Sequence, residues 1–117
     1  MLPIRFAITG PESSGKSTLT AQLANQYQTH WVPEYARTYL TFLDRPYTSD
    51  DVLLIARRQL LLEEEIANQT PTLLFADTEM IVIKIWYQHF YGPCPDWIQT
   101  AIDQSPYRHY FLTGIDL

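Results

Sequence analysis

The residue types most able to do chemistry stand together near the start of the chain. One segment there fits the phosphate-loop pattern G-x-x-x-x-G-K-[ST]: Gly10, Pro11, Glu12, Ser13, Ser14, Gly15, Lys16 and Ser17. Glycine permits backbone angles that turn several N–H groups inward, and a helix beginning after the loop adds partial positive charge. Lys16 would then reach the β and γ phosphates, while the Ser17 hydroxyl would bind magnesium. The segment predicts a site for a purine nucleoside triphosphate with Mg²⁺, and ATP is the expected nucleotide.

Two carboxylates and one arginine are candidates for the rest of this site. Asp77 ends an apolar stretch and is the predicted second magnesium anchor, because a hard cation selects carboxylate oxygen. An N-cap of the following helix is the other interpretation of Asp77, and the two roles are compatible. Glu34 and Arg37 are expected near the mouth of the site, with a surface ion pair as the alternative. The sequence thus predicts a charged cluster around the phosphates.

Other charged and aromatic residues are interpreted as structural. Arg57, Arg58 and the glutamates at 63–65 are expected on solvated helix faces, because consecutive glutamates spread around a helix. The histidines lack the spacing of metal ligands, and Cys94 lacks a nearby base. Four aromatic residues are expected to pack in the core: Trp86, Tyr87, Phe90 and Tyr91.

Strands and helices are predicted to alternate along the chain. Apolar runs predict strands at 4–9, 30–33, 72–76 and 108–112. Helices are predicted after the phosphate loop, at 36–43, from N-cap residues at 48–51 to about 68, at 80–91 and at 96–104. The β-branched residues of 80–91 also fit a strand, but its length and preceding cap favour a helix. In the first helix, the predicted inner face holds Leu19, Leu23 and Tyr27.

This alternation predicts an α/β fold with three layers, in which helices cover both faces of a parallel sheet. Ligands in such sheets bind at the carboxyl ends of the strands. Four polar residues fall at or just after such ends: Thr9, Glu34, Asp77 and Asp116. The fold class therefore agrees with the predicted position of the site.

Length and composition narrow the class of protein. A chain of 117 residues is long enough for one domain, expected to span 1–117. The net charge of -5 argues against a nucleic-acid groove, which needs clustered Lys and Arg. Cys94 cannot form an internal disulfide, and neither a signal peptide nor an apolar run of about 20 residues is visible. A cytoplasmic protein without membrane or nucleic-acid partners is expected.

Three segments together resemble one family. The stretch from Gly10 to Thr18, the segment Val32-Pro33-Glu34-Tyr35-Ala36-Arg37 and Asp77-Thr78-Glu79 are similar to the ribosylnicotinamide kinase domain of NadR-type proteins, and the resemblance covers nearly the whole chain. It implies a P-loop fold like that of nucleoside monophosphate kinases. The implied reaction moves the γ-phosphoryl group of ATP to the 5′-hydroxyl of nicotinamide riboside, a step in NAD biosynthesis.

The resemblance also implies roles for particular residues. Residues 10 to 18, including Thr18, would cradle ATP, and Asp77 would support Mg²⁺ together with Ser17. Glu34 and Arg37 would lie near the acceptor, where a carboxylate at Glu34 or Asp77 could orient the hydroxyl or take its proton. With Lys16, these are the expected catalytic residues. Phosphoryl transfer needs mainly positioning and charge neutralisation, so such a sparse set is sufficient.

The chain departs from this family at its end. Members would continue past residue 117 with a proline-tryptophan pair, an arginine-bearing lid and a final strand. We therefore expect the chain to bind ATP better than it transfers phosphate, and the strand at 108–112 to be an exposed edge that promotes self-association. The alternative function is an ATP-binding module that signals to a partner without productive transfer. A GTPase is disfavoured because no N-K-x-D segment is visible.

Overall fold

A computed structural model describes residues 3–9, 15–70, 72–77, 80–105 and 107–112. Within these ranges the chain forms four strands: β1 (Ile4–Thr9), β2 (Trp31–Val32), β3 (Leu73–Asp77) and β4 (Tyr107–Leu112). It also forms five helices: α1 (Lys16–Gln26), α2 (Tyr35–Phe42), α3 (Ser49–Asn68), α4 (Met80–Tyr91) and α5 (Asp96–Asp103). The order of elements is the predicted one, and the ambiguous segment after β3 is a helix.

The strands form a parallel sheet in the order β2-β3-β1-β4. Parallel neighbours need crossover connections, and helices supply them here, as the alternating pattern predicts. The pairing of Ile8 with Asp77 brings the carboxyl ends of β1 and β3 together. The residues that follow β1 and β3 therefore begin at the same end of the sheet, where the carboxyl ends of the strands lie.

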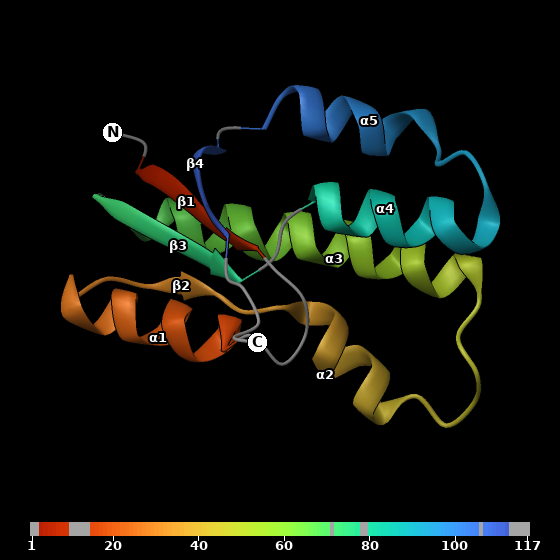
Figure 1. Ribbon diagram of the computed structural model, residues 1–117, viewed down its shortest axis with the longest axis horizontal. Coiled ribbons are helices and arrows are strands. Elements are labelled where there is room, and N and C mark those ends of the chain that lie inside the picture. Colours follow the sequence, from red (N-terminus) through yellow and green to blue (C-terminus); the bar gives the residue numbers. More distant parts are fainter. Residues whose placement is uncertain (1–2, 10–14, 71, 78–79, 106, 113–117) are drawn as a thin grey trace.

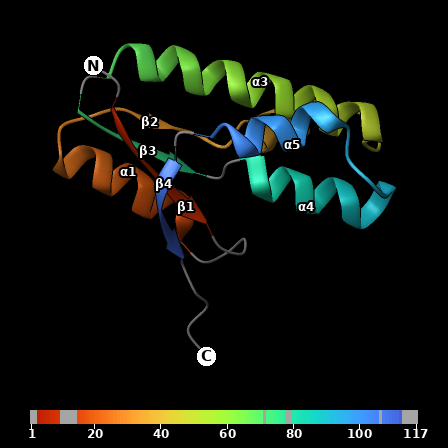
Figure 2. The ribbon, with the colours of Figure 1, turned by 90° about the horizontal axis from the view of Figure 1, so that it is seen from above.

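Helices cover the two faces of the sheet, with α1 on one side and the C-terminal half of α3 on the other (Figures 1 and 2). Side chains alternate between the faces, as a strand requires. The α3 face holds the buried cluster Ala7, Val32, Ala67, Leu74 and Ala76. The α1 face holds the buried cluster Ile8, Ala24 and Phe75. The three-layer α/β/α fold predicted from the sequence is confirmed.

The N-terminal half of α3 packs against helices instead of the sheet. Its buried residues join those of α4 and α5 in one cluster, with α2 packed against it: Val52, Ile55, Ala56, Met80, Ile83 and Ile98. We call this the helical cluster. Figure 1 shows α4 and α5 alongside this half of α3. The long helix thus joins two apolar clusters, and the functional residues described below lie near its middle.

Some sequence expectations about burial were wrong. Leu19 and Leu23 pack against the α1-face cluster as predicted, whereas Tyr27 is 53% exposed, because it lies at the C-cap, beyond the last residue of α1. Phe90 is 58% exposed and Tyr91 is 37% exposed, and neither packs in the core as predicted, since α4 turns only part of its aromatic surface toward the helical cluster.

Glu63 also departs from its expected solvated position. It is only 4% exposed, because it continues the inward stripe of α3 that includes Gln59 and Ala67. Its neighbours Glu64 and Glu65 are exposed, as expected. Consecutive residues on one turn of a helix point in different directions, so one of the three glutamates faces inward while the other two face solvent.

The described sheet ends with β2 on one side and β4 on the other. The position of β4 agrees with the expected edge, and self-association through it stays a prediction. Among the helices in the described ranges, none combines the length and the apolar character needed to cross a membrane.

Asp51 closes the turn between α2 and α3. Its buried carboxylate accepts two hydrogen bonds from Arg45, at 2.7 and 2.9 Å, one from Tyr39 Oη at 2.6 Å and one from Thr48 N–H at 2.8 Å. Thr48 and Asp51 also form a capping box at the start of α3. The Arg45 guanidinium, then the Tyr39 hydroxyl, hold the pKa of Asp51 well below its usual range.

We expect Asp51→Asn to lower the free energy of unfolding at neutral pH. A depressed carboxyl pKa contributes stability that is fully present above the unfolded value of about 4 and is lost progressively as pH falls from there through the lower folded value. Urea unfolding at pH 7 and pH 3 should therefore show a difference between wild type and variant that shrinks in acid. Asp50→Asn, one residue earlier and exposed, is the control and should have a smaller effect. Equal effects of both substitutions at pH 7 would contradict this role of Asp51.

Candidate active site

The start of α1 has the backbone conformation that the phosphate-loop motif requires. Gly15 precedes the helix with φ of 78°, a left-handed conformation that glycine adopts without steric cost. Its carbonyl accepts the Leu19 N–H at 2.9 Å, so the helix begins directly after it. The other predicted phosphate-loop residues, 10–14, lie outside the described residues. Thr18, predicted near the phosphates, is exposed in the first turn of α1.

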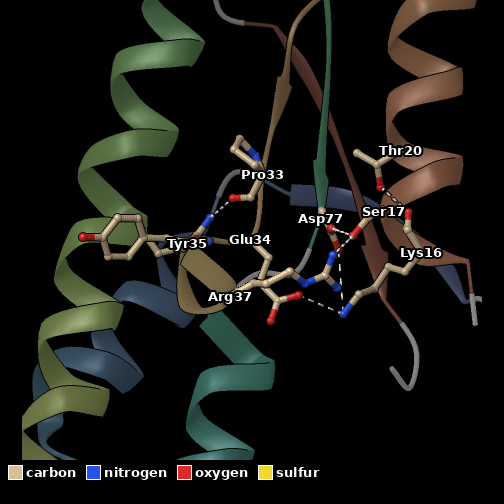
Figure 3. Close-up of polar contacts among 9 residues, drawn as sticks. Lys16, Ser17, Thr20, Pro33, Glu34, Tyr35, Arg37 and Asp77 are labelled. Carbon is tan, nitrogen blue, oxygen red and sulfur yellow. Dashed lines mark hydrogen bonds and ion pairs between the residues drawn. The ribbon is translucent and has the colours of Figure 1, made fainter. Parts of the chain in front are cut away.

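Lys16 lies between two carboxylates (Figure 3). Its Nζ is 3.4 Å from Glu34 Oε2 and 3.7 Å from Asp77 Oδ1. The lysine side chain is only 6% exposed, and those of Glu34 and Asp77 are 15% and 4% exposed. A buried ammonium needs such partners because its desolvation is otherwise unfavourable. The structure thus brings together three residues that the sequence places far apart.

Ser17 lies against the same aspartate. Its hydroxyl donates a short hydrogen bond to Asp77 Oδ2 and accepts one from Arg37 Nη1 at 3.1 Å. Arg37 comes from the first turn of α2, directly beyond Glu34. All four predicted catalytic residues, Lys16, Glu34, Arg37 and Asp77, therefore belong to one polar network with Ser17 (Figure 3). We call these five residues the charged network.

The oxygen donors of this network fit Mg²⁺. Asp77 is buried, and its Oδ1 accepts no hydrogen bond but faces Lys16 Nζ at 3.7 Å, so this oxygen is placed to meet positive charge. Hydroxyl and carboxylate oxygens are the ligands that this hard ion selects. In the described part of the chain, no group of three or more His, Cys, Asp and Glu residues could hold a metal by itself. Magnesium would therefore use Ser17 and Asp77 together with phosphate oxygens and water.

Gln59 fixes the position of Glu34, a role that the sequence did not reveal. This buried α3 side chain accepts the Tyr35 N–H at 2.9 Å and donates to the Pro33 carbonyl at 3.3 Å. It thereby satisfies backbone groups on both sides of Glu34, between the end of β2 and the start of α2. A glutamine within the apolar stripe of α3 was the available signal, but its partners depend on tertiary packing.

A surface cavity adjoins the charged network. It has a volume of about 360 Å³ and is lined by Glu34, Arg37, Leu40 and Thr41, all on one face of α2. A second cavity of about 280 Å³ lies on another face of the helix, where Tyr35, Tyr39 and Phe42 contribute with Arg58. Only the first shares Glu34 and Arg37 with the charged network, so it is the candidate space for an acceptor.

The remaining arginines of α3 make contacts elsewhere. Arg58 donates to the Tyr35 hydroxyl at 2.7 Å, and the Arg57 guanidinium lies 4.7 Å from the centre of the Trp97 ring. Both are exposed, as predicted. Asp116, which the sequence also placed near the site, and Glu79, from the segment that carries the family resemblance, lie outside the described residues.

Comparison with known proteins supports the same kind of domain. A family model described as an AAA domain matches residues 5–116. The trifunctional NAD biosynthesis/regulator protein NadR of Salmonella typhimurium strain LT2 is 30% identical over 105 residues, covering 84% of this chain and 25% of that protein. The chain thus spans a quarter of the length of this curated relative.

The solved structures include a similar fold. The crystal structure of thymidylate kinase from Ehrlichia chaffeensis matches with a TM-score of 0.61 at 13% sequence identity, covering 97% of this chain and 72% of that one. At this identity the likeness concerns the fold alone. It confirms the predicted α/β architecture, which resembles that of P-loop nucleoside monophosphate kinases.

Proposed function

Because this chain belongs to the AAA domain family, we propose that it binds ATP with Mg²⁺ and transfers the γ-phosphoryl group to nicotinamide riboside. The observation that carries the proposal is the charged network, in which Lys16, Ser17 and Asp77 meet Glu34 and Arg37 at the carboxyl edge of the sheet. This combination provides a phosphate-binding cation, hard oxygen ligands, and an acid and an arginine on the acceptor side.

Each residue has a distinct part in the proposed reaction. Lys16 neutralises charge on the β and γ phosphates, and Ser17 and Asp77 hold the metal. Bound Mg²⁺ would offset the negative charge that develops on the phosphates during transfer. Arg37 stabilises the transferring phosphoryl group from the side of α2. Since the transition state is mainly a problem of charge and alignment, no covalent intermediate is required.

Glu34 is assigned to the acceptor hydroxyl. The acceptor oxygen forms a bond to the γ-phosphorus, the bond from that phosphorus to the bridging oxygen breaks, ADP leaves, and the hydroxyl proton passes to the Glu34 carboxylate. Glu34 is suited to this because its backbone is held by Gln59 and its side chain lines the adjoining cavity. A carboxylate that is fixed in this way can orient a hydroxyl before transfer.

Four observations support nicotinamide riboside as the acceptor. The curated relative is described as a protein of NAD biosynthesis, and the segment with Glu34 and Arg37 resembles the ribosylnicotinamide kinase motif. The cavity of about 360 Å³ falls within the usual range for small-molecule sites. The nicotinamide ring of this nucleoside carries a positive charge, which the chain's net charge of -5 would attract.

A phosphate-transfer assay tests the proposal. With γ-labelled ATP and a panel of nucleosides and nucleotides, we expect label to pass to nicotinamide riboside more readily than to uncharged nucleosides. A preference for AMP or another monophosphate would overturn the acceptor. Calorimetric titration with ATP and Mg²⁺ should accompany the assay, because binding without transfer to any acceptor would support a nucleotide-binding module instead. Absence of ATP binding would overturn both.

A further inference from the structure

Arg37 contacts a hydroxyl that a metal ion would use as a ligand. Its guanidinium lies 3.1 Å from Ser17 Oγ, and that hydroxyl is hydrogen bonded to Asp77 Oδ2. Ser17 and Asp77 are the residues with the donors that fit Mg²⁺. We propose that Arg37 competes with the divalent cation for this pair of residues, so that loading the metal moves Arg37 toward the acceptor cavity. This inference rests on the proposed function and adds a regulation of the same site.

Charge supports the competition. The charged network holds two side-chain cations, Lys16 and Arg37, against two carboxylates, Glu34 and Asp77, so its side chains balance. A divalent ion at Ser17 and Asp77 would face the guanidinium across a single oxygen. Like charges at such a distance repel each other, although solvent screens part of this repulsion because Arg37 is exposed. The arrangement favours one cation at a time.

The two cations of the network differ in their freedom to move. Lys16 is buried between two carboxylates, whereas Arg37 is exposed on the first turn of α2. Arg37 also lines the acceptor cavity with Glu34. A displaced guanidinium therefore has space on the acceptor side, where its charge meets the γ-phosphoryl group. Metal loading and arginine positioning would then be coupled through Ser17.

The competition predicts that removal of the Arg37 charge raises the affinity for metal and lowers phosphate transfer. We expect Arg37→Met, which keeps an unbranched stem but removes the charge, to bind Mn²⁺ about fivefold more tightly, as loss of roughly 1 kcal/mol of competition predicts. Phosphate transfer by the same variant should fall. Arg37→Lys keeps a cation and should bind Mn²⁺ like wild type. Arg57→Met, which removes an exposed arginine stacked on Trp97, is the matched control and should leave Mn²⁺ affinity unchanged.

Electron paramagnetic resonance of free Mn²⁺, without nucleotide and at constant ionic strength, gives these affinities on the full chain. Circular dichroism establishes that each variant is folded. Equal Mn²⁺ affinity in wild type and Arg37→Met, in a protein that binds ATP with Mg²⁺, would overturn the competition and leave the proposed function standing. Wild type that binds neither Mn²⁺ nor ATP would overturn both. Tighter Mn²⁺ binding in Arg37→Met but not in Arg37→Lys or Arg57→Met is the supporting result.

Discussion

Lys16→Ala is expected to weaken binding of ATP by at least about 1.4 kcal/mol, a tenfold loss of affinity. Lys16 Nζ is the only cation within salt-bridge distance of both Glu34 and Asp77 among the described residues. Without it, two carboxylates would face the triphosphate with one fewer positive charge, so attraction is lost and repulsion is gained. The substitution both removes attraction to the phosphates and adds repulsion from the carboxylates, so the expected loss of ATP affinity is large.

Calorimetric titration with ATP and Mg²⁺ measures this loss. Lys84→Ala is the matched control, because Lys84 lies on α4 and donates to Gln99 of α5, away from the charged network. The control should bind ATP like wild type. Equal ATP affinity in Lys16→Ala and wild type would refute the assignment of Lys16 to the phosphates.

Asp77→Asn should reduce whatever rate of phosphate transfer the chain supports by about 10²-fold or more. The substitution keeps the shape of the side chain and its contact with Ser17, but it removes the negative charge that faces Lys16 and a metal ion. The concentration of Mg²⁺ needed for half-maximal transfer should therefore rise. Glu34→Gln should reduce transfer by a similar factor, because the acceptor hydroxyl loses its proton acceptor.

The two substitutions are distinguished by metal dependence. Transfer assays over a series of Mg²⁺ concentrations should show a higher requirement in Asp77→Asn and an unchanged one in Glu34→Gln. Glu65→Gln, at an exposed position of α3, controls for the change of net charge. Full transfer by Asp77→Asn at the wild-type Mg²⁺ requirement would exclude Asp77 as a metal ligand.

The sequence predicted the order of elements because periodicity and turn residues report on each segment locally. It also predicted that Glu34 and Asp77 would approach Lys16, since residues after parallel strands meet at one edge of the sheet. That argument needs only strand direction and sheet order. The functional roles of these residues remain predictions, which the experiments above test.

The features that the sequence did not predict depend on packing between distant segments. Gln59 fixes the backbone around Glu34 only because α3 passes beside the junction of β2 and α2. The burial of Glu63 follows from the rotation of α3 about its own axis, which a run of similar residues does not specify. The contact of Arg37 with Ser17 likewise needs α1 and α2 to begin at the same edge of the sheet. The local sequence pattern does not specify contacts between segments that are far apart in the chain.

The span of α3 has a consequence for how the protein unfolds. Residues near its start, such as Ile55, belong to the helical cluster, while Ala67 near its end packs on the sheet. Both halves belong to one continuous hydrogen-bonded helix. Unfolding of one half would therefore destabilise the other half and expose the apolar surface packed against it. We therefore expect the sheet and the helical cluster to unfold together as one cooperative unit.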